Sequence, residues 1–535
     1  MKKLLLLGDE AIAKGALDAG MSGIYAYPGT PSTEITEYVQ NSKQAAKDNV
    51  RSEWSVNEKT AMETALGMSY AGKRAMVCMK HVGMNVAADG FINSAVTGAN
   101  GGLIVTAADD PSMHSSQNEQ DSRFYGKFAF IPTFEPSDHQ EAYDMTRYGF
   151  EMSEKYKIPV LMRITTRLAH SRAAVELSEP KPQNVKKLPG NLHQFILLPS
   201  IARKQYVDLL DKQAGLEEES ETSGFNKYFE GEDKSKGIIV CGLAYNYLME
   251  NYPDRKVPYP VLKISQYPLP RKMIEKIVAE CDEILVMEEG MPIVEESLKG
   301  FLGQGPKITG RLDGTLPRVG ELNPNSVAVA LGMEDTIGQD VPDFVAGRPP
   351  QLCVGCPHID SYNALNAALA GLAPGRVFAD IGCYTLGSFE PYDAINSCVD
   401  MGASITMAIG AADAGMFPAV AVIGDSTFTH SGITGLLDAV NTQSPITVLI
   451  LDNGITAMTG CQLSGATGKI EDICLGLGVE EAHIRLLNPL GKHHEKNMEI
   501  MKEELAYKGV SVVIPRRACV VDTRKLVSYK DSVKR

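Results

Sequence analysis

The chain has 535 residues, of which 44% are apolar and 22% are charged, and its formal net charge is −14. At roughly 150 residues per domain this length predicts three to four domains, and the acidic balance argues against a general nucleic-acid binder, which needs a surplus of Lys and Arg. No apolar run approaches the roughly 20 residues that span a membrane. The leucine run at residues 4–7 turns polar without a cleavage site, so we interpret it as a first strand and expect a cytoplasmic protein.

Three α/β blocks follow one another along the chain. In residues 1–190, short apolar runs alternate with helix-like stretches, which is the pattern of a mostly parallel sheet. Residues 191–335 begin with an acidic stretch at 216–237 that is typical of a solvated face or linker, and continue as a smaller α/β domain. A second linker leads to a third α/β block at 345–535.

The first and third blocks share an internal repeat. ALGMSYAG at 65–72 matches AIGAADAG at 408–415, and the strand before Asp110 matches the strand before Asn453, both at an offset of 343 residues. Small residues at this spacing often indicate only close helix packing. One register held across both elements favours duplication of a single α/β fold.

Two strands of the third block end in candidate metal ligands. AVAVIG runs into Asp425-Ser426, and ITVLIL ends just before Asn453. Ligands of open α/β sheets bind beyond the carboxyl ends of strands, and a carboxylate with an amide oxygen suits Mg²⁺ and leaves positions open for a diphosphate. Either site alone is typical of a turn. The pair, with 26 residues between Ser426 and Asn453, resembles the GDG…N motif of thiamine diphosphate enzymes, with Ser as the third residue.

This motif implies a set of cofactor contacts. It implies that Mg²⁺ is held by Asp425, Asn453 and Ile455, and that Gly424 and Ser426 contact the cofactor. Thiamine also needs a carboxylic acid beside N1′ of its aminopyrimidine, and an apolar setting would raise the pKa of that acid.

Glu58 is the candidate for this acid. It opens EKTAMETALGMSYAG, whose composition suits a buried helix. Glu53 and Glu63 are alternatives, and a Glu at a helix start is commonly a surface residue that the helix dipole favours.

Many motifs of the chain resemble the alpha subunit of indolepyruvate:ferredoxin oxidoreductase, a member of the 2-oxoacid:ferredoxin oxidoreductases. They include YAYPGTPSTEI, EWSVNEKTAMETALGMSYAG, MKHVGMNVAADG, LCVGCPH, GDSTFTHSGI and RRACV. The resemblance implies a pyrimidine-binding thiamine domain at 1–190, a diphosphate- and Mg-binding thiamine domain at 345–535, both with doubly wound parallel sheets, and a transketolase C-terminal-like α/β domain at 191–335. It selects Glu58 as the residue that contacts the aminopyrimidine.

The resemblance adds further site residues. It implies catalytic positions for Thr30 and His81, and cofactor contacts for Asn85 and His358. Gln117 and Arg123 in SSQNEQDSR are further candidates. For this pair, as for His81 and Asn85, a turn or helix-cap role is an equal alternative.

Cys353 and Cys356 form the only CxxC among ten cysteines. Alone, the pair is consistent with zinc, a redox dithiol or an iron–sulfur cluster, although zinc ribbons normally need a second CxxC and a redox dithiol needs no further cysteine. In the family, the cluster nearest thiamine is a [4Fe–4S] held by a CxxC, a third cysteine further on and a fourth after the thiamine motif. This implies ligation by Cys353, Cys356, Cys383 and Cys519, and leaves packing roles for Cys78, Cys241, Cys281, Cys398 and Cys474.

The implied reaction is oxidative decarboxylation of arylpyruvate-type 2-oxoacids, such as indolepyruvate, to acyl-CoA. Its cofactors would be thiamine diphosphate, Mg²⁺ and the cluster, with electrons passing singly to ferredoxin or a partner. CoA would be a co-substrate, although the sequence shows no site for it, and a smaller beta subunit would complete a homodimer or α2β2 enzyme. The alternatives are a non-oxidative thiamine-dependent 2-oxoacid decarboxylase or carboligase, and a non-catalytic scaffold, against which GDS…N and Glu58 argue.

The sequence departs from the family pattern at three points. It stops soon after Cys519 without the CxxCxxCxxxCP runs of the family's ferredoxin-like domain, so we expect electrons to leave from the proximal cluster or through a separate subunit. Ile359 stands where the family has Arg after CPGCPH, and Cys461 replaces the His of TGHQ. These changes leave the substrate side chain and the electron acceptor open.

Overall fold

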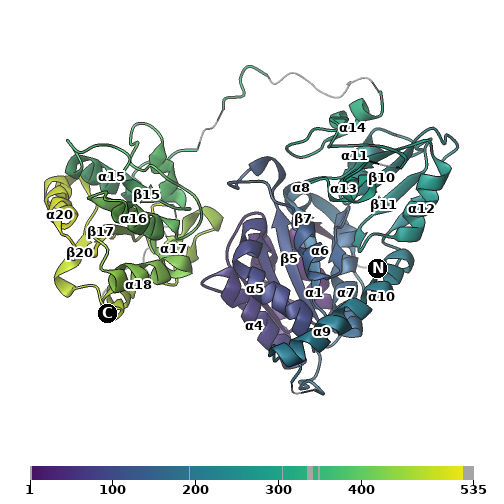
Figure 1. Cartoon of the computed structure of the whole chain (residues 1–535), viewed down its shortest axis with the longest axis horizontal. Coiled ribbons are helices and arrows are strands. Elements are labelled where there is room, and N and C mark those ends of the chain that lie inside the picture. The colour runs from purple at the N-terminus through teal and green to yellow at the C-terminus, as the bar shows by residue number, and fades with distance from the viewer. Residues whose placement is uncertain (1–2, 192, 304, 334–341, 348–349, 522–535) are drawn as a thin grey trace. The chain divides into compact units, whose positions relative to one another are not determined.

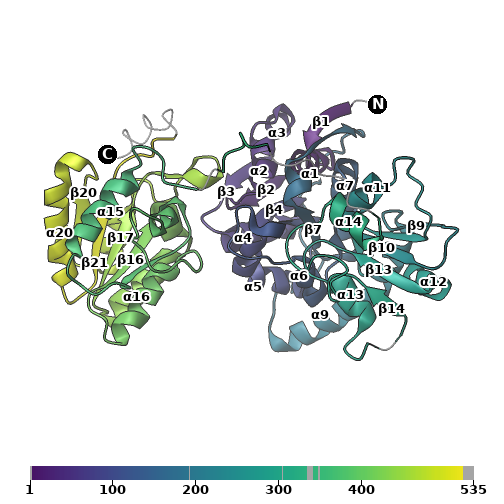
Figure 2. The ribbon, with the colours of Figure 1, turned by 90° about the horizontal axis from the view of Figure 1, so that it is seen from above.

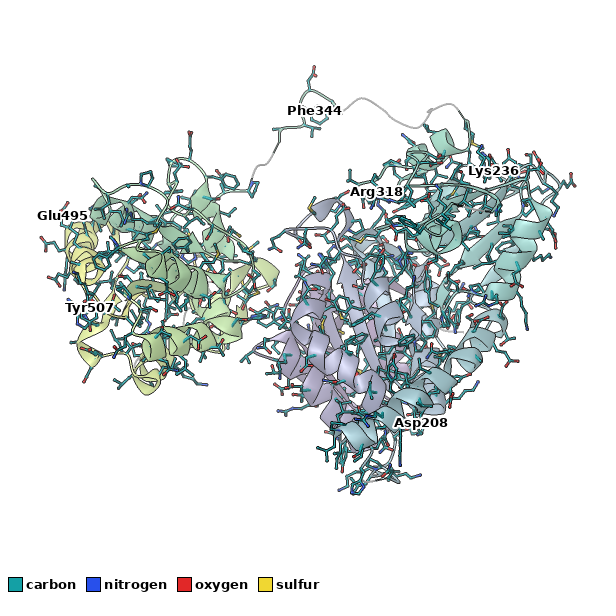
Figure 3. The ribbon with its side chains drawn as sticks, in the orientation of Figure 1. Asp208, Lys236, Arg318, Phe344, Glu495 and Tyr507 are labelled. Carbon is teal, nitrogen blue, oxygen red and sulfur yellow. The ribbon has the colours of Figure 1, made fainter. Side chains whose placement is uncertain are left out.

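The structure is a computed structural model that describes residues 3–191, 193–303, 305–333, 342–347 and 350–521. The chain forms two compact units, unit 1 (Met1–Val341) and unit 2 (Pro342–Arg535), coloured from purple to teal and from green to yellow in Figures 1 and 2. Charged side chains such as Asp208, Arg318 and Glu495 lie exposed on their surfaces (Figure 3). None of the helices in the described ranges has the length and apolar character that crossing a bilayer requires.

A seven-stranded sheet organises the N-terminal part of unit 1. Its order is β12-β6-β7-β5-β4-β2-β3, and every neighbouring pair is parallel except β12 with β6. Strands β4, β5 and β7 are buried along their whole length, as expected of a parallel sheet with both faces covered. The strands are β2 (Gly23–Ala26), β3 (Arg51–Trp54), β4 (Ala75–Lys80), β5 (Leu103–Asp109), β6 (Thr133–Phe134), β7 (Val160–Thr165) and β12 (Gln266–Tyr267).

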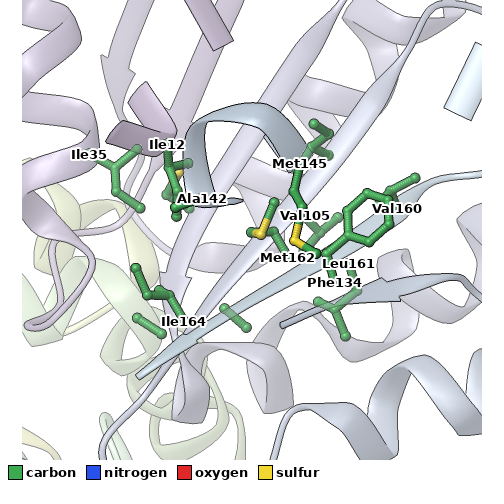
Figure 4. Packing of buried hydrophobic residues seen from close by; sticks show 14 of the residues in the cluster. Ile12, Ile35, Val105, Phe134, Ala142, Met145, Val160, Leu161, Met162 and Ile164 are labelled. Atoms are coloured by element: carbon green, nitrogen blue, oxygen red, sulfur yellow. The ribbon is translucent and has the colours of Figure 1, made fainter. Parts of the chain in front are cut away.

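Helices connect these strands and cover the sheet. They are α1 (Gly8–Asp18), α2 (Thr33–Gln40), α3 (Lys43–Lys47), α4 (Glu58–Tyr70), α5 (His81–Thr97), α6 (Arg123–Ala129), α7 (His139–Tyr156) and α8 (Thr166–His170). A separate antiparallel pair joins β1 (Lys3–Leu7) to β8 (Arg172–Glu176). Figure 4 shows part of the core, in which Ile12 of α1 and Ala142 and Met145 of α7 lie with Val105 and Met162 of the sheet.

A second sheet completes unit 1, with the order β14-β13-β10-β11-β9. It is parallel except where β9 meets β11. Its strands are β9 (Lys227–Phe229), β10 (Gly237–Cys241), β11 (Val261–Ile264), β13 (Glu283–Met287) and β14 (Lys307–Thr309), and its helices are α9 (Pro199–Asp211), α10 (Gln213–Thr222), α11 (Ala244–Glu250), α12 (Arg271–Glu280), α13 (Ile293–Lys299) and α14 (Pro324–Ala330). The acidic stretch at 216–237 thus includes much of α10 and all of β9, and Leu216 is fully buried.

Buried ion pairs join the two sheets of unit 1. Arg163 of β7 binds Asp109 of β5 and donates to the Glu289 carbonyl at 2.9 Å. Arg123 pairs with Glu288 at 3.0 Å. Removing one partner of such a pair leaves an uncompensated buried charge, which typically costs about 3–5 kcal/mol. These residues therefore fix how the smaller sheet sits on the larger one.

Unit 2 contains a five-stranded parallel sheet with the order β15-β16-β17-β21-β20. Its strands are β15 (Val377–Ala379), β16 (Ala419–Gly424), β17 (Ile446–Leu451), β20 (Ile484–Leu487) and β21 (Ser511–Pro515), with a small hairpin of β18 (Ile455–Thr456) and β19 (Gln462–Leu463). Along β16, Ala419, Ala421 and Ile423 enter one buried cluster, whereas Val420 and Val422 enter another. Since successive side chains point to opposite faces, both faces of this sheet are covered.

The helices of unit 2 are α15 (Pro357–Ala368), α16 (Ala403–Asp413), α17 (Asp425–Thr427), a π-helical turn (Phe428–Gly432), α18 (Ile433–Thr442), α19 (Ile470–Leu477) and α20 (His494–Ala506). Shifted by 343 residues, α4, β4 and β5 of unit 1 fall within two residues of α16, β16 and β17. In both units the two strands are parallel neighbours. The predicted α/β class, with two doubly wound parallel sheets and a smaller α/β sheet, is confirmed.

Candidate functional site

The predicted metal ligands of unit 2 lie at one edge of its sheet. Gly424, the last residue of β16, pairs with Leu451, the last residue of β17. Asp425 and Asn453 follow these strands at the carboxyl edge, where open α/β sheets bind ligands, and both are buried. The turn after Asp425 is π-helical, a geometry that is frequent at functional sites.

The donor set fits a cation. Among the described residues, Oδ2 of Asp425 is buried and receives no hydrogen bond. Burial first, and then the nearby Asp452 carboxylate, raises the pKa of Asp425. Asp452 itself accepts from Nε of Arg516 at 2.5 Å. An uncompensated buried carboxylate is costly, and Mg²⁺ would satisfy it with the hard oxygen ligand it prefers.

Asn453 and Ser426 lie at the same edge of the sheet as Asp425. The amide oxygen of Asn453 accepts from the N–H of Ile455 at 3.0 Å and keeps a second lone pair for a ligand. The hydroxyl of Ser426 lies 2.8 Å from that of Thr456. A Cβ at Gly424 would lie 2.6 Å from the ring of Tyr384, so the packing of this tyrosine explains the glycine.

Three segments of unit 2 bring the four candidate cysteines together. Cys353 and Cys356 precede α15, Cys383 follows β15, and Cys519 follows β21. Burial first, and then the Cys356 and Cys519 thiols, raises the pKa of Cys383. Burial, followed by the effects of Cys519 and Cys353, raises the pKa of Cys356 to about 11. The four thiols therefore lie close enough to disfavour one another's ionisation, and four thiolates would need a strong positive charge among them.

Arg517 holds this arrangement. It donates to the carbonyl of Gly355, within the CxxC loop, and to Asp360 of α15 at 3.0 Å. The backbone N–H of Cys519 donates to the carbonyl of Asn453 at 3.2 Å. The segment that carries Cys519 is thus tied both to the CxxC loop and to a candidate magnesium ligand.

The spacing of the thiols differs from that of a zinc site. A tetrahedral zinc ion with Zn–S bonds of about 2.3 Å places its sulfur atoms about 3.8 Å apart. No three of these four described cysteines have sulfur atoms within 4.8 Å of one another. In this structure the four described cysteines therefore do not form the compact sulfur group of a tetrahedral zinc site.

A buried imidazole connects the thiols to the candidate magnesium site. Nε2 of His358 lies 3.3 Å from Sγ of Cys383 and 3.4 Å from Nδ2 of Asn453. Burial lowers the pKa of His358 to about 4, so the ring is neutral at physiological pH. His358, predicted as a cofactor contact, therefore lies between the two sets of candidate ligands.

In unit 1, burial distinguishes the candidate activating acid. Glu58 begins α4 and is buried, whereas Glu53 pairs with Arg51 and Glu63 pairs with Lys59, and neither of these two is buried. Asn57 caps the helix, its Oδ1 accepting from the N–H of Thr60 at 2.9 Å.

A glycine of α5 makes room for this acid. A Cβ at Gly83 would lie 2.7 Å from both Cγ and Oε1 of Glu58. Any larger residue at position 83 would therefore displace the carboxylate.

The other candidates of unit 1 lie on loops and helix starts after its parallel strands. The carbonyl of Thr30 accepts from the Ser115 hydroxyl at 3.3 Å. His81 is buried at the start of α5, with Nε2 3.2 Å from the Asn118 carbonyl. Asn85 accepts from the Tyr125 hydroxyl. Gln117 is exposed, and Arg123 belongs to the buried ion pairs between the sheets.

Sequence analysis missed Lys80 near these residues. Lys80 ends the fully buried β4, and its ammonium donates to the carbonyl and hydroxyl of Ser115 at 2.7 and 3.1 Å. Burial lowers its pKa to about 8. The signal was available, because a lysine that ends an entirely apolar strand must have its charge compensated inside the protein.

Two protein families match parts of the chain. Residues 14–196 match "Pyruvate flavodoxin/ferredoxin oxidoreductase, thiamine diP-bdg". Residues 380–513 match "Thiamine pyrophosphate enzyme, C-terminal TPP binding domain". The second match includes Asp425 and Asn453, and the first includes Glu58.

Curated relatives extend the match over nearly the whole chain. Indolepyruvate oxidoreductase subunit IorA of Archaeoglobus fulgidus is 39% identical over 99% of this chain and 89% of its own length. The subunit of the same name from Pyrococcus abyssi is also 39% identical, over 97% and 86%. A solved 2-oxoglutarate:ferredoxin oxidoreductase from Magnetococcus marinus superposes with a TM-score of 0.48 at 16% identity, over 62% of this chain and 65% of that chain. The chain therefore belongs to the IorA family of indolepyruvate oxidoreductase subunits, which are thiamine-diphosphate-dependent 2-oxoacid oxidoreductases.

Proposed function

We propose that this chain oxidatively decarboxylates arylpyruvate-type 2-oxoacids, indolepyruvate among them, to acyl-CoA. Electrons would pass through a [4Fe–4S] cluster to ferredoxin or to a partner subunit. The observation that carries this proposal is the contact sequence Asn453–His358–Cys383, which links the candidate magnesium ligands to a set of four cysteines. The substrate class rests on the names of the relatives.

The chain would contain both kinds of thiamine-binding domain. Thiamine diphosphate, when bound with Mg²⁺, supplies a carbon nucleophile and an electron sink. Residues 345–535 would form the diphosphate domain, in which Asp425, Asn453 and Ile455 hold Mg²⁺ and Ser426 contacts the diphosphate. Residues 1–190 would form the pyrimidine domain, with residues 191–335 as a further α/β domain.

Glu58 would hold a proton on its carboxyl group, shared with N1′ of the aminopyrimidine. Its burial excludes water that would otherwise solvate the carboxylate, and Gly83 fixes the space it occupies. Thr30, His81 and Asn85, which lie on segments after the parallel strands of the same sheet, would line the substrate side.

The four cysteines would form the electron-transfer site. A [4Fe–4S] cluster accepts one electron at a time, at a potential set by hydrogen bonds to its sulfur atoms and by solvent exposure. His358 would contribute a neutral ring beside Cys383, and Arg517 would keep the CxxC loop in place. Cys353 is exposed, and its neighbour Val354 is 98% exposed, so this corner offers the acceptor an approach.

The complete enzyme would include a smaller beta subunit in a homodimeric or α2β2 assembly, since the relatives are themselves named as subunits. CoA would take the acyl group at a site that the partner completes. The four-thiol set argues against the non-oxidative decarboxylase, which needs no electron acceptor.

Anaerobic purification with co-expressed partner genes tests the proposal. We expect about four iron atoms per chain, and dye reduction that needs CoA and is faster with indolepyruvate than with pyruvate or 2-oxoglutarate. Cys383→Ser should lose iron and dye reduction, whereas the matched Cys398→Ser, at an exposed cysteine outside the set, should keep both. A wild-type protein without iron that releases aldehyde would instead establish the non-oxidative reaction.

A further inference from the structure

A second cluster of candidate ligands lies in unit 1. It consists of Asp9 of α1, Glu34 of α2 and His170 of α8. One ligand atom from each residue lies within 4.8 Å of the other two, and among the described residues this is the only such group of His, Cys, Asp and Glu side chains. Oε1 of Glu34 and Nε2 of His170 lie 3.5 Å apart.

In the described part of the chain, the Asp9 carboxylate receives no hydrogen bond. It is 0% exposed, and neither Oδ1 nor Oδ2 has a hydrogen-bond partner among the described residues. Asp18, at the other end of α1, is equally buried but accepts hydrogen bonds from Tyr143 at 2.8 Å and Lys14 at 2.6 Å. A buried carboxylate without donors is costly, so Asp9 needs a cation or a proton.

The surroundings of Asp9 favour the cation. Oε2 of Glu34 is also buried and has no hydrogen-bond partner in the described part of the chain. One uncompensated carboxylate could be satisfied by a proton, but here two carboxyl groups present open oxygen atoms beside an imidazole nitrogen. The two outer side chains, Glu34 and His170, are each 35% exposed, so an ion can reach the cluster from solvent.

The donor set and its spacing indicate which ion fits. One imidazole and two carboxylates suit a borderline divalent ion such as Zn²⁺, Mn²⁺ or Fe²⁺. In a tetrahedral site with bonds of about 2.0–2.1 Å, ligand atoms lie about 3.3 Å apart. The 3.5 Å separation between Glu34 and His170 is close to this value.

The position of the cluster suggests what it does. Helices α2 and α8 follow β2 and β7 at the carboxyl edge of the large sheet, and α2 directly follows the loop that carries Thr30. An ion held by Asp9, Glu34 and His170 would fasten the end of this loop to α1 and α8. Thr30 would then be positioned by a metal that is distinct from the ions of unit 2.

We propose that Asp9, Glu34 and His170 form a binding site for a divalent transition metal, which anchors the loop of residues 27–32. The proposal does not depend on the thiamine chemistry. Its ligands differ in type from the cysteines and from the magnesium ligands of unit 2, which allows the sites to be told apart spectroscopically.

Cobalt binding tests the site in the full-length chain. Co²⁺ is titrated in the presence of excess Mg²⁺, which occupies the oxygen ligands of unit 2, and Co²⁺ bound to cysteines is recognised by its thiolate charge-transfer absorption. We expect one equivalent of Co²⁺ without that absorption, together with a higher Tm. Asp9→Asn and His170→Gln should each bind this equivalent at least about tenfold more weakly, since even outer-shell changes cost about 10–100-fold in metal affinity.

His114→Gln is the matched control. His114 forms an ion pair with Glu321 at the same 3.5 Å distance, but it belongs to no three-ligand group in the described residues. This variant should bind Co²⁺ as the wild type does. The proposal would be overturned if the wild type bound no Co²⁺ outside the cysteines. It would also be overturned if His170→Gln bound Co²⁺ as tightly as the wild type. His170 is partly exposed, so this variant should still fold. Asp9 would instead hold a proton if Asp9→Asn had a higher Tm than the wild type and if no added metal changed the Tm of the wild type.

Discussion

The two repeated halves of the molecule share a scaffold but end their strands in different chemistry. In unit 1, β4 ends at Lys80, and Asp110 follows β5. In unit 2, Asp425 follows β16, and Asn453 follows β17. The edge of the first sheet thus carries a cation and a carboxylate, whereas the edge of the second carries a carboxylate and an amide.

Hydrogen bonding separates the two carboxylates. Asp110 accepts from the N–H of Ser115 and from the hydroxyl groups of Ser116 and Thr166. Asp425 keeps one buried oxygen without a donor among the described residues. The comparison teaches that the fold supplies only the position, and that the donors around a carboxylate decide whether it stabilises a loop or binds a metal.

The largest effect is expected from Glu58 of unit 1, the proposed activating acid. Glu58→Gln should lower kcat by about 10²–10⁴-fold, because the amide cannot hold the transferable proton. Magnesium and thiamine diphosphate should still bind, as isothermal calorimetry would show. Glu63→Gln, in the exposed pair with Lys59, is the control and should keep its activity. Retained activity in Glu58→Gln would shift the role to Glu53.

The next effect contrasts the two strand-edge carboxylates. Asp425→Asn should weaken Mg²⁺ binding more than about 100-fold, yet stabilise the metal-free chain at alkaline pH because it removes an uncompensated buried charge. Asp110→Asn should destabilise the chain by about 1–3 kcal/mol, since it loses hydrogen bonds to a charged acceptor. Urea unfolding in EDTA measures both changes. The same sign for the two variants would contradict the distinction between them.

The pH dependence of stability should also differ between the halves. Burial first raises the pKa of Glu289 in unit 1 to about 7 and that of Asp380 in unit 2 to about 6. A carboxyl whose folded pKa is raised stabilises the fold below its unfolded pKa and loses this contribution as pH rises through the folded value. Ionisation of each of these two residues should therefore lower the free energy of unfolding by up to about 3 kcal/mol. This loss should be complete at a higher pH for Glu289 than for Asp380.

Two probes report the pH-dependent loss of stability in each unit separately. Fluorescence of Trp54, the one tryptophan of the chain, reports unit 1, and hydrogen exchange of β17 amides reports unit 2. Burial also raises the pKa of the neighbouring Glu288 to about 7, so Glu289→Gln should reduce, and not abolish, the loss that fluorescence detects between pH 4.5 and 7. The exchange of β17 should stay unchanged. A fluorescence transition that keeps its pH dependence in this variant would assign it to other groups.

The smallest effect concerns matched glycines on the repeated helices. Gly67 of α4 and Gly410 of α16 occupy equivalent positions, and a Cβ would meet no atom within 4 Å at either. Gly→Ala should stabilise each half by about 0.5–1 kcal/mol, because alanine has the higher helix propensity. Differential scanning calorimetry of the two variants measures this gain. Unequal gains would show that one of the two helix faces is covered in the assembled enzyme.

The sequence predicted the candidate magnesium ligands Asp425 and Asn453 because parallel strands place their carboxyl ends at one edge of the sheet. Recognising β16 and β17 as neighbouring strands was enough for this prediction. The cysteine set followed from family resemblance, since its members lie far apart in the sequence. The position of His358 between Cys383 and Asn453 depends on how α15 packs, which no spacing encodes. The group of Asp9, Glu34 and His170 was missed for a similar reason, because each residue comes from a different element and no motif joins them.

One backbone hydrogen bond, from the N–H of Cys519 to the carbonyl of Asn453, has a thermodynamic consequence. It couples a candidate iron ligand to a candidate magnesium ligand within a single segment of chain. If loading of one proposed centre moves that segment, each centre would by reciprocity change the affinity of the other by the same factor. Assembly of the proposed holoenzyme would then be cooperative, and we expect a chain deprived of iron to bind thiamine diphosphate less tightly.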